Sequence, residues 1–134
     1  MIYAQVGFFK KNFSITSSKS LSDVATGFQQ FLQSQRWKVQ SNVQGDQGIV
    51  QAQKPGILRD IVAADRALTF KFDATTPGQI QVDVGVGKLL KNLAITAIET
   101  LLLSELFLVV DIPEILFTEH VENELIGQLR AIAQ

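Results

Sequence analysis

Four stretches near the middle of the chain alternate apolar with polar side chains, and this alternation limits the possible folds more than any other feature. They are residues 37–43, 49–54, 68–73 and 79–86. Because successive side chains of a strand point to opposite faces, each stretch would present one apolar and one polar face. Gly-containing turns at 44–48 and 75–78 join the stretches in pairs, as in β-hairpins. One-sided strands predict an antiparallel sheet with one face on a core and the other in water, not a parallel sheet buried on both faces.

A helix is expected before these strands, after a short strand at residues 12–16. Its apolar side chains recur three and four positions apart, which places them on one face of a helix. They are Leu21, Val24, Ala25, Phe28, Phe31 and Leu32. Ser20 and Asp23 stand at the spacing of a capping box, which favours a helix start at this point.

The most apolar part of the chain is residues 89–110, which we expect to form a helix. Its first half is amphipathic, whereas its second half, from 101 onward, has only two polar residues, Ser104 and Glu105. A helix that is apolar on all sides has to be covered by the chain's own sheet, a second copy, a partner or a lipid. Spanning a bilayer takes about twenty apolar residues. Because Glu99 and Glu105 would lie inside such a span, we do not expect a transmembrane helix.

A final helix is expected over residues 114–133, with Asp111 as its N-cap and Pro113 tolerated in the first turn. Its inward face would hold Ile115, Val121, Leu125, Leu129 and Ile132. Together these elements predict a single α+β domain over residues 1–134. The antiparallel sheet would have about five strands with helices on one face, in the order β-α-β-β-β-β-α-α. The segment 55–66 between the two hairpins fits either a short packed helix or an apolar flap.

Composition adds further limits. The chain has no Cys, which excludes disulfides, thiolate metal sites and Cys nucleophiles. Its beginning lacks the long apolar core and small-residue cleavage site of a secretory signal, so we expect a cytoplasmic protein. Residues 1–91 carry eleven Lys/Arg and six Asp/Glu, whereas residues 92–134 carry one and seven, which is +5 against −6. This division favours docking of the tail on the body or head-to-tail association, although chance distribution over solvated faces explains it equally well.

No residue pattern points to catalysis, a cofactor or a metal. The single His120 has Glu124 one helical turn away, but metal binding would need a third ligand, and a solvated Glu-rich helix face explains both residues. Gly85 and Gly87, before Lys88, lack the third Gly and the Gly-Lys-Ser/Thr of phosphate-binding loops. We expect these glycines to end the sheet and to allow a sharp turn into a helix that begins near Lys88.

Paired carboxylates are interleaved with basic residues. Asp73 and Asp83 should lie on neighbouring strands of the wet face, and Asp60 and Asp65 lie in the segment between the hairpins. Acid–base catalysis would need one carboxylate in a desolvating pocket, so we expect all four to be solubilising residues. Nucleic-acid binding is not expected either, because no Lys/Arg cluster contains aromatic residues and the sequence pI is about 5.8.

Two further stretches carry a resemblance. The run Gly56-Ile57-Leu58-Arg59-Asp60 and the residues from Ala67 to Lys88 resemble a loose group of small uncharacterised bacterial proteins, in which a Gly-Lys ends the sheet and an apolar helix follows. The resemblance covers residues 54–110. It implies a strand–helix–four-strand–helix layout, similar to TATA-binding-protein-like or helix-grip architectures, and it implies no activity. In this chain the apolar helix is Leu-rich with two Glu rather than Gly- and Trp-rich, which argues against a direct membrane role.

These observations favour a protein that binds rather than catalyses, in one of two ways. In the first, it is an interaction module, most simply a homodimer. Its apolar surface would comprise Ile57, Leu58, Ile61, Leu102, Leu103, Leu106, Phe107 and Val110. In the second, the long helix crosses the sheet and leaves an apolar pocket for a lipid-like ligand or a membrane-surface contact. That pocket would be lined by Phe70, Phe72, Val82, Val84, Leu101 and Leu108. We expect no catalytic residue, metal or cofactor.

Overall fold

The computed structural model describes residues 11–53, 66–93, 109–110 and 119–134. Its elements, in chain order, are β1 (Lys11–Thr16), α2 (Leu21–Ser34), β2 (Lys38–Gln44), β3 (Gln47–Gln53), β4 (Arg66–Asp73), β5 (Gln79–Lys88), β6 (Val109–Val110) and α4 (Glu119–Ala133). The segment predicted as a helix or a flap, 55–66, lies outside the described residues except for Arg66, which begins β4.

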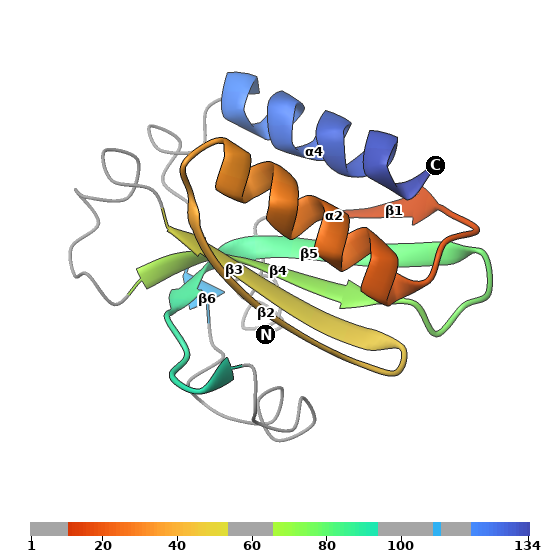
Figure 1. Ribbon diagram of the computed structural model, residues 1–134, viewed down its shortest axis with the longest axis horizontal. Coiled ribbons are helices and arrows are strands. Elements are labelled where there is room, and N and C mark those ends of the chain that lie inside the picture. Colours follow the sequence, from red (N-terminus) through yellow and green to blue (C-terminus); the bar gives the residue numbers. More distant parts are fainter. Residues whose placement is uncertain (1–10, 54–65, 94–108, 111–118) are drawn as a thin grey trace, which may run out of the picture.

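The strands form one antiparallel sheet in the order β1-β5-β4-β3-β2. The two-residue β6 also pairs with β5, at Val86 and Gly87, beyond the part of β5 that pairs with β1. Helices α2 and α4 lie side by side over one face of this sheet (Figure 1). The predicted α+β class, with an antiparallel sheet and helices on one face, is confirmed.

The main core lies between this face and α2. Phe70 and Phe72 of β4 stand on the helix side of the sheet, and Phe28 of α2 packs edge-on against both, with ring centroids 4.8 and 6.4 Å away. All three side chains are buried. Burying a side chain of this size contributes roughly 1.5–3 kcal/mol before the cost of ordering the chain, so the three rings form a large part of the core.

Both ends of α2 follow from local sequence. The Ser20 hydroxyl accepts a hydrogen bond from the Asp23 amide at 3.1 Å, which confirms the predicted N-cap. At the other end Arg36 takes a left-handed conformation with φ of 71°, and the Trp37 amide donates back to the Leu32 carbonyl at 3.0 Å. This is the Schellman arrangement, in which the left-handed position usually belongs to Gly.

Helix α4 is docked against α2 and the edge strand β1. The Ser17 hydroxyl and the Lys19 ammonium donate to the carbonyls of Ala133 and Ile132, at 2.5 and 2.7 Å. They satisfy carbonyls that a helix C-terminus leaves without partners, and the Lys19 charge complements the helix dipole. Arg130 lies 5.3 Å from the centre of the Phe13 ring on β1. The predicted final helix is confirmed over 119–133, and its expected start at 114 lies outside the described residues.

The predicted helix over residues 89–110 is wrong at both of its described ends. Strand β5 continues through Gly85 and Gly87 to Lys88, because both glycines pair with β4, opposite Thr69 and Ala67. Residues 89 and 90 after it are irregular and Lys91 and Asn92 form a turn, so no helix begins near Lys88. At the far end, Val109 and Val110 form β6. Residues 94–108 lie outside the described residues, so a helix over 101–108 stays a prediction.

Candidate functional site

The face of the sheet away from the helices, which we call the second face, carries a row of polar side chains across three strands. Gln40 of β2 stands opposite Gln51 of β3, and Gln51 stands opposite Thr69 of β4. Asn42 lies on the same face, two residues from Gln40 along β2. Ser41, which lies between Gln40 and Asn42 on β2, points to the helix side, where it donates to Gln29 of α2 at 2.6 Å.

This row binds the backbone of residues 89–93, which we call the strap. The Leu90 amide donates to the Gln51 side-chain oxygen at 2.9 Å, and the Gln40 side-chain amide donates to the Leu90 carbonyl at 2.8 Å. Gln40 also donates to Gln51 at 2.8 Å, and the Asn42 side chain donates to the Leu93 carbonyl at 2.7 Å. The two glutamines therefore bind the N–H and C=O of Leu90 much as a neighbouring strand would. We call Gln40, Asn42 and Gln51 the amide ladder.

The amide ladder is largely removed from water. Gln51 and Thr69 are each 1% exposed and Asn42 is 7% exposed. Gln51 donates to the Thr69 hydroxyl at 3.1 Å, and that hydroxyl donates to the Ala67 carbonyl at 3.2 Å. Within the described ranges, no buried side-chain nitrogen or oxygen lacks a hydrogen-bond partner. Because a buried polar group without a partner costs about 1–3 kcal/mol, the strap and the ladder depend on each other.

Burial on the second face extends to apolar side chains. Leu90, Leu93 and Ile49 of β3 are buried, at 3%, 1% and 0% exposure, yet none of them belongs to the main core under α2. The prediction of a wet second face is therefore wrong over β3 and its neighbours. Sequence reasoning placed Gln40 and Gln51 on the solvent side because Gln is usually exposed. No local sequence signal marks their role, because Leu90 lies 50 and 39 residues away along the chain.

Two carboxylates of the second face, Asp73 and Asp83, lie on β4 and β5. Burial raises the pKa of the half-buried Asp83, and the neighbouring Asp73 adds to this rise, while the ammonium of Lys71, directly across the strands, opposes it. The pKa of Asp73 is lowered by the Thr75 hydroxyl and amide, which donate to one carboxylate oxygen at 2.5 and 2.9 Å. Asp83 is thus less fully solvated than predicted, whereas Asp73 is held in a turn.

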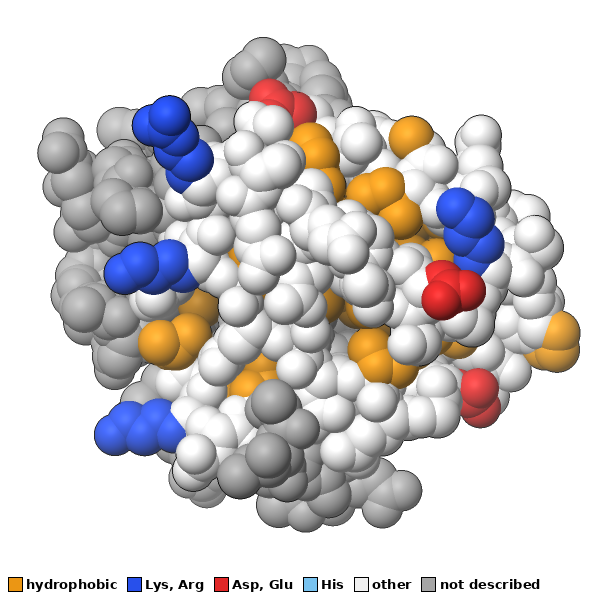
Figure 2. Space-filling view, viewed as in Figure 1, with side chains coloured by type: hydrophobic (Ala, Val, Ile, Leu, Met, Phe, Trp, Pro, Cys, Tyr) orange, Lys and Arg blue, Asp and Glu red, His pale blue; other side chains and the backbone are white. Residues whose placement is uncertain are grey.

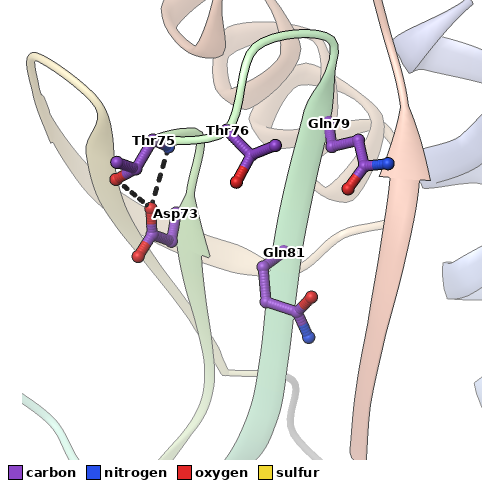
Figure 3. A pocket seen from close by; sticks show the side chains of 5 residues that line it. All are labelled: Asp73, Thr75, Thr76, Gln79 and Gln81. Carbon is purple, nitrogen blue, oxygen red and sulfur yellow. Dashed lines mark hydrogen bonds between the residues drawn. The ribbon is translucent and has the colours of Figure 1, made fainter.

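A polar hollow of about 260 Å³ opens beside this turn (Figure 3). It is lined by Asp73, Thr75, Thr76, Gln79 and Gln81. Asp73 is the sole charged side chain among these five. One of its carboxylate oxygens already accepts two hydrogen bonds from Thr75. In the part of the chain that the structure describes, no group of three His, Cys, Asp or Glu side chains is placed to hold a metal.

The residues predicted for the apolar pocket divide into two sets. Phe70, Phe72, Val82 and Val84 are 0–1% exposed and belong to the main core under α2. Leu101 and Leu108 lie outside the described residues. The four described side chains therefore lie in the main core, and a pocket that also reaches Leu101 and Leu108 stays a prediction.

Of the residues predicted for the interaction surface, only Val110 is described, and it lies in β6 opposite Val86. The others lie outside the described ranges. On the face of the molecule in Figure 2, the apolar side chains of the described residues appear in small separate groups among polar and backbone atoms. That view shows no single large apolar patch on described residues.

Comparison with known proteins places the chain in no family, since no family model, curated protein or solved structure matches it. Among the described helices, neither has the length and hydropathy needed to cross a membrane.

Proposed function

We propose that this protein is a non-catalytic interaction module that self-associates through the apolar segment 101–110. The observation that carries the proposal is that α2 and α4 already cover the helix face of the sheet (Figure 1). Gly27 of α2 faces Ile132 of α4 so closely that an added Cβ would lie 2.8 Å from the Ile132 Cγ2 atom. Close packing of the two helices leaves no reason to place a further apolar helix between them.

The points where the apolar segment leaves and rejoins the described fold give further support. Before it, the Leu93 carbonyl is bound by Asn42 on the second face. At its far end, Val109 pairs with Gly87 of β5. Neither anchor lies on the helix face. An apolar run between two such anchors needs a cover other than α2 and α4, and a second copy related by a two-fold axis is the simplest cover.

The alternative, a lipid-like ligand in a pocket over the sheet, has less support. Four of its six predicted lining residues are buried in the main core, and two of them, Phe70 and Phe72, pack against Phe28 of α2. A catalytic role also has little to rest on, because the chain contains one His and no Cys. These considerations favour association between proteins.

The proposal is tested by light scattering on the full chain, with Leu106→Glu and Gln33→Glu as a matched pair. Gln33 lies on the exposed side of α2, so Gln33→Glu adds the same charge away from the proposed interface. We expect wild type and Gln33→Glu to have twice the chain mass of 14.8 kDa, and Leu106→Glu to have the single mass. A dimer that survives Leu106→Glu would remove this segment from the interface.

A further inference from the structure

We infer that the amide ladder is a latch and that the strap opens as a unit, separately from the main core. The inference deepens the proposed function, because the latched strap fixes the position of Leu93, the last described residue before the apolar segment. Its structural part, that the strap opens independently, does not require the protein to dimerise.

The latch consists of side chains rather than of paired strands. Leu90 is bound at both its N–H and its C=O by Gln51 and Gln40, and Leu93 is bound at its C=O by Asn42. In a sheet, such bonds come from backbone groups, which substitution by any residue other than Pro leaves in place. Here each bond depends on one side-chain amide, so a single substitution can weaken the strap and leave the strand pairing intact.

The strap is also separate from the main core in its packing. The core under α2 includes Phe28, Phe70 and Leu129 but neither Leu90 nor Leu93. Ile49, which is also buried outside that core, lies on the opposite face of the sheet from Val50 and α2. Opening the strap therefore breaks its hydrogen bonds to the amide ladder but leaves the contacts of α2 and α4 in place. Elements of this kind open with a smaller free energy than the whole fold.

The strap contains a turn. Asn92 takes a left-handed conformation with φ of 58° directly before Leu93. Asn tolerates this conformation better than most residues, and it marks the place where the chain turns after crossing the second face. The strap thus runs from the end of β5 at Lys88 to Leu93, directly after this turn.

Hydrogen exchange of the folded full chain, read at single amides by NMR, tests the latch with a matched pair of variants. Gln40→Ala removes a side-chain donor on the second face, and Ser41→Ala removes one from the next residue, on the helix face. The Leu90 amide reports the strap, and the Phe28 amide, in the middle of α2, reports the main core.

In wild type we expect the Leu90 amide to be protected, but less than the Phe28 amide. Gln40→Ala should speed exchange at Leu90 by about tenfold, because, of the two hydrogen bonds that Gln40 donates, only the one to Leu90 is broken when the strap opens. Because that variant destabilises the closed state itself, exchange at Phe28 should also rise. Ser41→Ala distinguishes local opening from global unfolding. The hydrogen bond from Ser41 to Gln29 in wild type survives opening of the strap. Its loss should therefore speed exchange at Phe28 and leave the exchange rate at Leu90 unchanged.

Equal acceleration of Leu90 and Phe28 by Ser41→Ala would overturn the inference, because the strap would then open only with global unfolding. An unprotected Leu90 amide in wild type would overturn it too. The mass of Gln40→Ala by light scattering tests the coupling to self-association, which should weaken. If wild type is a monomer, the proposed function fails, while the exchange data still decide whether the latch exists.

Discussion

Gly27 and Gly127 form a matched pair for testing how closely α2 and α4 pack. Both lie inside helices, and substitution by Ala at either site adds one methyl group. At Gly27 that group would meet the Ile132 Cγ2 atom at 2.8 Å, whereas at Gly127 it would meet no atom within 4 Å. The two sites therefore share the gain in helix propensity and differ in packing.

The magnitudes follow from these two terms. Ala is more favourable than Gly in a helix interior by about 1 kcal/mol, so Gly127→Ala should raise the free energy of unfolding by about that amount. Adding a methyl group to a close-packed contact costs about 1–3 kcal/mol. At Gly27 the gain and the cost oppose each other, and Ile132 can shift only by moving a branched side chain against its own helix. We expect Gly27→Ala to be less stable than Gly127→Ala by roughly 1–3 kcal/mol.

Urea unfolding followed by the fluorescence of Trp37, the only Trp and a buried one, measures both variants. Protein concentration has to be the same throughout, because self-association would change the apparent stability. If Gly27→Ala stabilised the protein as much as Gly127→Ala, the close approach of α2 and α4 would be refuted, and with it the argument that the helix face is fully covered.

Two further predictions concern the end of α2 and the half-buried carboxylate. Arg36→Gly should raise the unfolding free energy by about 0.5–1 kcal/mol, because Arg36 holds a left-handed φ of 71° at an exposed helix end, and Arg36→Ala should give no such gain in the same urea assay. The pKa of Asp83 is raised in the fold, so its contribution to stability is greatest below its ordinary value of 3.8 and declines as the pH rises through the folded-state pKa. Asp83→Asn should therefore be more stable than wild type at neutral pH, with the difference shrinking as the pH falls toward 3.8; a difference that grew on acidification would contradict this sign.

Local patterns predicted the parts of the fold that local interactions decide. The Ser20 cap, the apolar stripe from Leu21 to Leu32 and the two hairpins are short-range features, and the structure confirms them. The spacing of apolar residues also predicted α4, since Leu125 and Leu129 are buried and Gln128 and Arg130 are exposed.

Long-range pairing decided the features that sequence reasoning missed. Nothing near Gly85 and Gly87 shows that Thr69 and Ala67 will pair with them and extend β5 to Lys88. The role of Gln40 and Gln51 depends in the same way on Leu90, which is 50 and 39 residues away along the chain. A polar side chain on a strand has the same sequence pattern whether it binds water or a buried backbone.

Self-association through the apolar segment is the central claim, and hydrogen exchange of the full chain at high and low protein concentration tests it most directly. Exchange is read by mass spectrometry of peptides that cover residues 101–110 and, as a control, α2. The claim predicts that dilution speeds exchange in the peptide over 101–110, because its partner copy dissociates, while exchange in α2 changes little. Exchange in 101–110 that is the same at both concentrations, in a protein whose mass stays at 14.8 kDa, would contradict it.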